Sequence, residues 1–153
     1  MSVIAPGTAA PEFTLRQADG SAFTRENLLG QTTVLVFYPF AFSPVCTDQL
    51  QVYEEAIDEI RAGGAEMYGV SVDSPYAQAA FKERLGVSIA QLSDFPSGEA
   101  SKAFGAYFDP GKMSNRCLVI VGPDGVVTWS HEAASPAELP GVNLIIEALG
   151  ALT

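Results

Sequence analysis

The chain has 153 residues, of which 48% are apolar and 17% charged, a composition typical of a folded globular protein and not of a disordered chain. The formal net charge of −10 disfavours contact with phosphate backbones, so we expect no nucleic-acid partner. The length suits one domain over residues 1–153, and no apolar run approaches the ~20 residues that cross a bilayer.

Residues 1–6 lack the basic and apolar regions of a secretory signal, so we expect a cytoplasmic protein with no membrane partner. The two cysteines, Cys46 and Cys117, are too few for a disulfide scaffold. In a reducing cytosol each is either a buried small apolar residue or a reactive thiol. Their local sequences must distinguish these two possibilities.

The first half of the chain predicts a hairpin followed by a buried strand and a helix. Residues 12–17 alternate apolar with polar, and after a turn at Asp19-Gly20 residues 22–24 form the returning strand of an N-terminal β-hairpin. Residues 33–39 are β-branched and aromatic on both faces, which predicts a central buried strand. One helix follows, with apolar residues at helical spacing, and it ends at Gly63-Gly64.

The second half predicts alternating strands and helices. We expect strands over 66–72, 91–94, 117–121 and 126–130, the last two forming a hairpin around Pro123-Asp124-Gly125. We expect helices from the Ser74-Pro75 cap to Leu85, over 97–104 and around 142–149. This order predicts an α/β, thioredoxin-like fold whose central mixed sheet is flanked by helices on both faces.

The stretch around Cys46 lies between the buried strand and the first long helix. Ser43 suits the N-cap of that helix and Pro44 its first position, which puts Cys46 in the first turn. Unpaired N–H groups and the helix dipole favour a thiolate there. The loop also follows the carboxyl end of a central strand, where ligands bind in open α/β sheets. On these grounds alone, a packing role for Cys46 stays open beside a reactive one.

Several motifs resemble those of the peroxiredoxin family. Pro39, Ser43 and Cys46 match its Pro-x-x-x-Thr/Ser-x-x-Cys motif, residues 6–15 are similar to its first strand, and Asn115-Arg116 is similar to its arginine site. The resemblance runs from about residue 3 to residue 150 and is nearest to the one-cysteine alkyl hydroperoxide reductase E type. It implies a thiol-dependent peroxidase, an antioxidant enzyme that reduces hydrogen peroxide and organic hydroperoxides.

The resemblance also implies catalytic roles for four residues. Cys46 would be the nucleophile that becomes sulfenic acid, and Arg116 would hold the thiolate and the peroxide oxygens. The Ser43 hydroxyl would donate to bound peroxide, and Pro39 would shield the thiolate from water. Position 43 departs from the Thr of most members, and Pro44 is a second departure that is compatible with a first helical turn.

Three further residues are candidates for the substrate site. Gln49 stands where the family often has Glu or Gln and would orient Arg116. Phe42 and Val45 belong to an apolar stretch, residues 40–45, on a loop that must admit peroxide. That stretch lines a pocket for the organic part of an alkyl hydroperoxide, forms the interface of a homodimer, which the resemblance also implies, or does both.

Cys117 follows Arg116 in a predicted strand, so its side chain should point to the opposite face of the sheet. We therefore expect an external thiol reductant, either a thioredoxin-like protein or a low-molecular-weight thiol, to reduce the sulfenic acid of Cys46. The lone His131 has no metal-ligand spacing, and no dinucleotide, P-loop or zinc-hydrolase motif is present, so we expect no metal and no cofactor.

Two other functions remain as alternatives. A thiol–disulfide oxidoreductase is disfavoured because position 49 is Gln and not the second cysteine of a Cys-x-x-Cys motif. A non-enzymatic binding or holdase module would make Cys46 structural.

Overall fold

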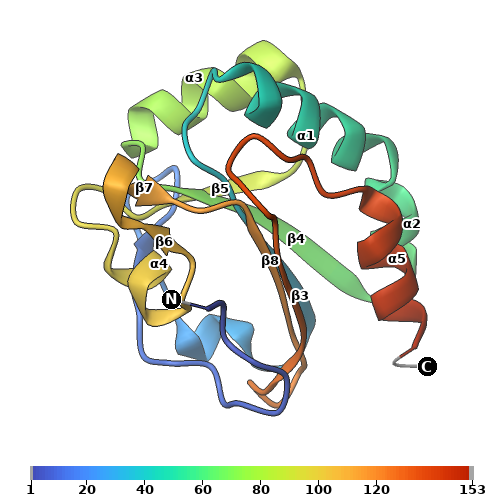
Figure 1. Ribbon diagram of the computed structural model, residues 1–153. Coiled ribbons are helices and arrows are strands. Elements are labelled where there is room, and N and C mark those ends of the chain that lie inside the picture. The colour runs from blue at the N-terminus through green and yellow to red at the C-terminus, as the bar shows by residue number, and fades with distance from the viewer. Residues whose placement is uncertain (1, 152–153) are drawn as a thin grey trace.

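The computed structural model describes residues 2–151, which are built around a seven-stranded mixed sheet (Figure 1). In chain order its strands are β1 (Thr14–Arg16), β2 (Ala22–Thr24), β3 (Thr32–Phe37), β4 (Ala65–Ser71), β5 (Ala90–Ser93), β8 (Cys117–Val121) and β9 (Val127–Glu132). In space their order is β2-β1-β5-β4-β3-β8-β9. The central strands β3, β4 and β5 are parallel, while β1 and β8 join them antiparallel.

Helices cover both faces of this sheet, as predicted. The α-helices are α1 (Pro44–Glu55), α2 (Ile57–Ala62), α3 (Pro75–Leu85), α4 (Glu99–Ala103) and α5 (Val142–Gly150). Short 3-10 helices, η1 (Arg25–Leu28) and η2 (Asp109–Gly111), and a small hairpin of β6 (Tyr107–Phe108) and β7 (Met113–Ser114) complete the fold. In Figure 1, α1 and α3 lie along the top and α5 on the right, while α4 lies with β6 and β7 on the left.

The sheet separates two cores, because successive residues of each strand point to opposite faces. We call the first the helical core: α1, α2, α3 and α5 pack there on side chains that include Val36, Leu118 and Ile120. We call the second the N-terminal core: α4, η1 and the segment before β1 pack there on Phe37, Cys117 and their neighbours. Every residue of β8 is buried, and the strand lies between β3 and β9.

The structure departs from the predicted elements in a few places. The single helix expected up to Gly63 is two helices, because Ala56 leaves the helical region at φ −104° and ψ 2° and its N–H bonds to the Tyr53 carbonyl in a tight turn. The β6–β7 hairpin was not predicted, since two-residue strands carry no periodicity. The predicted N-terminal hairpin is confirmed, with strand β1 shorter than expected.

Two helix-ending glycines give a matched test of this backbone. Gly86 ends α3 at φ +68°, where a side chain strains the backbone, whereas Gly63 ends α2 at φ −80°. We expect Gly86→Ala to lower the free energy of unfolding by about 1–2 kcal/mol. Gly63→Ala should leave it unchanged or raise it by up to about 1 kcal/mol, because it restricts only the unfolded chain. Chemical denaturation of both variants measures this, and equal losses would contradict the assigned conformations.

Candidate active site

The candidate site lies where β3 gives way to α1, at the carboxyl edge of the parallel strands. Tyr38 extends β3 by donating its N–H to the Val70 carbonyl at 2.9 Å, after which residues 39–43 turn away from the sheet. Ser43 then caps α1, and its Oγ accepts the Cys46 N–H at 3.3 Å. The sequence-predicted cap, Pro44 at the first helical position and Cys46 in the first turn are therefore all present.

Cys46 faces inward from α1. The residues one and two turns further along the same face, Gln49, Leu50 and Tyr53, are also buried, and Cys46 has 0% exposure. Leu50 and Tyr53 belong with Cys46 to the helical core. The sulfur is therefore held in surroundings with little water, where charged partners act strongly.

Arg116 reaches this sulfur from the residue before β8. Its Nη2 donates to Cys46 Sγ at 3.3 Å, its Nη1 to Gln49 Oε1 at 2.5 Å, and its Nε to the carbonyl oxygen of Pro136 at 2.8 Å. The guanidinium thus has three acceptors: two are side chains of α1, and the third is a carbonyl of the segment that joins β9 to α5. The sequence-predicted trio of Cys46, Gln49 and Arg116 is brought into contact.

The charge of Arg116 is unusual because the side chain is only 1% exposed and makes no ion pair with a carboxylate among residues 2–151. A buried cation is costly unless an anion or several acceptors compensate it. Gln49 and Pro136 supply neutral acceptors, and Cys46 Sγ is the contacting group that can ionise. The arrangement therefore sets a fixed, buried cation directly against the sulfur of Cys46.

The remaining predicted site residues lie in the loop before α1 and at its first turn. Pro39 is buried, Ser43 and Val45 are half-buried, and Phe42 is exposed. The Ser43 oxygen accepts from the helix, which leaves its proton free for another acceptor. Phe42 stands at φ +69°, a strained backbone conformation for an aromatic residue, and its ring packs on Phe81 with centroids 5.1 Å apart.

Asp73 is a contributor that the sequence reasoning missed. It follows β4, whose carboxyl end lies beside that of β3, and its Oδ2 accepts the Ala41 N–H and the Ser71 hydroxyl, each at 2.7 Å. Gln78 of α3 donates to the same Ser71 oxygen at 2.9 Å. This chain of hydrogen bonds ties the loop over Cys46 to its neighbouring strand. A polar residue directly after a strand parallel to β3 was the available signal.

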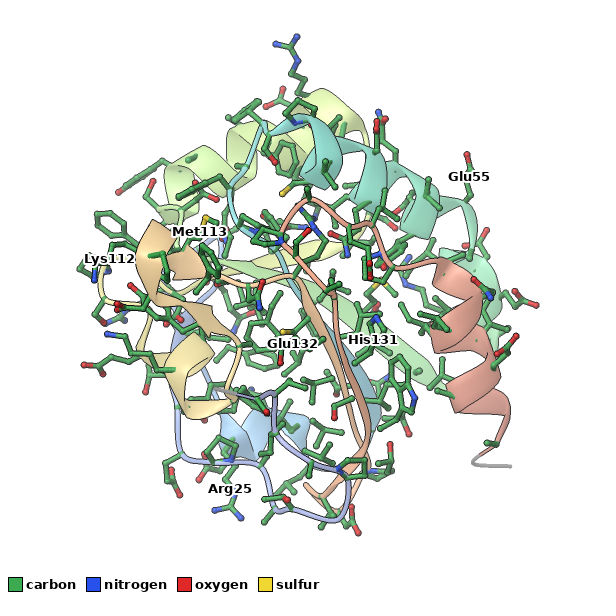
Figure 2. All side chains as sticks on the ribbon, in the orientation of Figure 1. Arg25, Glu55, Lys112, Met113, His131 and Glu132 are labelled. Atoms are coloured by element: carbon green, nitrogen blue, oxygen red, sulfur yellow. The ribbon has the colours of Figure 1, made fainter. Side chains whose placement is uncertain are left out.

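Cys117 lies on the other side of the sheet, as the alternation of strand residues predicts. It packs in the N-terminal core, whereas Cys46 packs in the helical core. Burial, and to a lesser degree the nearby Glu132 carboxylate, raises the pKa of the Cys117 thiol to about 12. Figure 2 shows the same alternation on β9, where His131 and Glu132 point to opposite sides. Cys117 therefore stays protonated at neutral pH.

His131 stacks on Trp129, with ring planes 6° apart, on the edge strand β9. Within residues 2–151, no three His, Cys, Asp or Glu side chains gather as a metal site would require. Over the same residues, no helix has the length and apolar character of a membrane span.

Comparisons with known proteins find similar sequences and similar folds. The model of the AhpC/TSA family matches residues 6–130. Alkyl hydroperoxide reductase E of Mycobacterium tuberculosis is 30% identical over 149 residues, which cover 96% of this chain and 97% of that protein.

Solved structures confirm the predicted thioredoxin-like fold. AhpC of Enterococcus faecalis superposes with a TM-score of 0.88 at 24% identity, covering 99% of this chain and 93% of that one. Reduced Prx3 of Vibrio vulnificus, solved in complex with hydrogen peroxide, gives a TM-score of 0.87 at 29% identity, covering 95% of this chain and 99% of that one.

Replacing Asp73 tests whether its hydrogen bond to the Ala41 N–H holds the loop closed, and a buried aspartate elsewhere in the chain serves as the control. A hydrogen bond to a charged acceptor contributes about 1.5–3 kcal/mol, so Asp73→Ala should raise the population of an open loop by about tenfold or more. Alkylation of Cys46 by iodoacetamide, which requires an accessible sulfur, should accelerate accordingly.

Asp94→Ala is the control, because Asp94 accepts the Ala100 and Ser101 N–H groups at the start of α4, away from this loop. It should destabilise the protein without changing the alkylation rate. Equal rates in Asp73→Ala and the wild type would show that Asp73 does not hold the loop closed.

Proposed function

The chain belongs to the AhpC/TSA family of peroxiredoxins, thiol-dependent peroxidases, and we propose that it reduces hydrogen peroxide and organic hydroperoxides by a one-cysteine mechanism. The observation that carries the proposal is the contact between the buried Arg116 guanidinium and Cys46 Sγ. The names of two relatives support the substrate class: one is an alkyl hydroperoxide reductase, and the other was solved with hydrogen peroxide. A cytoplasmic location, where thiols are available, is part of the proposal.

In the first step the Cys46 thiolate attacks one oxygen of the peroxide. An S–O bond forms, the O–O bond breaks, and the leaving oxygen takes a proton to depart as water or an alcohol. Sulfur is oxidised to sulfenic acid and the peroxide is reduced by two electrons. Arg116, and the Ser43 hydroxyl with its free proton, donate to the oxygens on which charge develops, which stabilises the transition state more than the ground state.

In the second step an external thiol attacks the Cys46 sulfenic acid, releasing water and forming a mixed disulfide. A second thiol then attacks that disulfide, which frees Cys46 and leaves the reductant oxidised to its own disulfide. Either a thioredoxin-like protein or a low-molecular-weight thiol supplies these two electrons. Cys117 does not take part, because it packs on the opposite face of the sheet.

The peroxidase activity is tested by consumption of hydrogen peroxide in the presence of dithiothreitol. Wild type should consume peroxide catalytically and Cys46→Ser should not. Arg116→Lys keeps the charge but loses the planar fork, so it should oxidise about 10²–10³-fold more slowly. An active Cys46→Ser variant would refute the proposal, and a fully active Arg116→Lys variant would remove Arg116 from it.

The one-cysteine mechanism is tested by mass spectrometry of the intact chain after one equivalent of peroxide. We expect the mass to increase by one oxygen atom, and Cys117→Ser should give the same increase. A loss of two hydrogens in the wild type that disappears in Cys117→Ser would instead show a disulfide between the two cysteines.

We also propose a homodimer formed at the edge that carries the site. Exposed aromatic residues follow the carboxyl ends of β3, β4 and β5, which lie side by side: Phe40 and Phe42, then Tyr76, then Phe95. A twofold pair would bury this apolar surface on both subunits. Phe42 and Val45 lie beside Cys46 as well, so the organic part of an alkyl hydroperoxide can contact the same surface.

Light scattering over a concentration series tests the dimer. Tyr76→Glu should shift the protein to a monomer, because it places a charge within the apolar surface. Leu29→Glu is the control: Leu29 is also an exposed large apolar residue, but it follows η1, which Figure 1 shows at the opposite end of the molecule. A wild type that is monomeric at every concentration would exclude the dimer.

A further inference from the structure

Tyr53 carries a buried hydroxyl group to which the proposed mechanism gives no role. The residue has 0% exposure and lies on α1 one turn after Gln49, on the same face of the helix. Its hydroxyl donates to the carbonyl oxygen of Pro140 at 2.6 Å, and the Gln49 Nε2 donates to that hydroxyl at 3.1 Å. Tyr53 is therefore connected to Arg116 through a single side chain.

The direction of these hydrogen bonds follows from counting protons. The Pro140 carbonyl has none, so the hydroxyl must donate its only proton there. Burial raises the pKa of Tyr53 to about 12, so this proton is retained at neutral pH. The hydroxyl can then only accept from Gln49, which turns the amide nitrogen toward Tyr53 and leaves Oε1 facing the Arg116 Nη1.

The opposite orientation of the amide is excluded by the same count. It would set the Gln49 NH₂ against the Arg116 N–H groups, donor against donor, and its oxygen against a hydroxyl with no proton left to give. Without the Tyr53 hydroxyl, the Gln49 NH₂ loses its acceptor and only Arg116 favours the observed orientation. The observed orientation supports Arg116 and the opposite one repels it.

We propose that Tyr53 is a positioning residue of the peroxidase reaction, acting through Gln49 to hold the Arg116 guanidinium against Cys46. The inference rests on the proposed function, since it concerns the same site. The segment between β9 and α5 completes the arrangement: its Pro140 carbonyl fixes the Tyr53 proton, while its Pro136 carbonyl accepts from the Arg116 Nε. The same segment therefore orients Arg116 in two ways: directly through the Pro136 carbonyl, and indirectly through Tyr53 and Gln49.

Tyr53→Phe removes a single oxygen atom and tests this inference. We expect the second-order rate of Cys46 oxidation by hydrogen peroxide to fall by about ten- to a hundredfold, the usual effect of losing a group that orients an active-site residue. Ser101→Ala is the control, because it removes a buried hydroxyl from the Ser101–Ser114 pair in α4 and β7. It should leave the rate unchanged.

Combination with Gln49→Ala separates positioning from a general loss of structure. If Tyr53 acts through Gln49, then adding Tyr53→Phe to Gln49→Ala should change the oxidation rate by no more than about twofold. Multiplying effects of the two substitutions would overturn the inference, as would an unchanged rate in Tyr53→Phe.

The outcome does not depend on Tyr53→Phe folding, because Gln49→Ala alone must also slow oxidation. A Gln49→Ala variant as fast as wild type would overturn the inference, because it removes the route through Gln49 on which the inference rests. A wild type that fails to react with peroxide would instead refute the proposed function itself, so the two failures are distinguishable.

Discussion

The contact between the Arg116 guanidinium and the Cys46 sulfur is the interaction on which the rest of the site depends. Both side chains are buried, and no carboxylate pairs with Arg116 among residues 2–151. A charge removed from water in this way must be compensated locally. The carbonyl of Pro136 and the amide oxygen of Gln49 do so in part, and the thiolate of Cys46 does so when it forms. Stability of the buried cation and reactivity of the cysteine are therefore two consequences of one arrangement.

The fold holds this pair by joining elements that are distant in sequence. Helix α1 presents Cys46 and Gln49 on its buried face, and Arg116 directly precedes β8, the strand next to β3. The backbone between β9 and α5 accepts from both Arg116 and Tyr53. Asp73 holds the loop between β3 and α1, in which Phe42 occupies a strained conformation. The sheet itself keeps Cys117 apart from Cys46, because the two side chains pack in different cores.

Local signals in the sequence were sufficient for the elements that carry the site. Ser43 and Pro44 predicted the start of α1, the alternation of β8 predicted the separation of Arg116 from Cys117, and the spacing of Pro39, Ser43 and Cys46 indicated the family. Asp73, the Tyr53 proton and the turn at Ala56 could not be predicted, because each depends on which backbone groups the folded chain brings near. Side-chain hydrogen bonds to distant carbonyls leave no periodic pattern in a sequence.

A double-mutant cycle in the free energy of unfolding tests the central interaction most directly. Cys46→Ala and Arg116→Met each remove one partner, and chemical denaturation at neutral pH gives the stability of both single variants, the double variant and the wild type. If each group compensates the other, the two losses are not additive, and the coupling free energy lies between about 0.5 and 3 kcal/mol. Additivity within about 0.3 kcal/mol would contradict the account, since Arg116 would then be stabilised independently of the Cys46 sulfur.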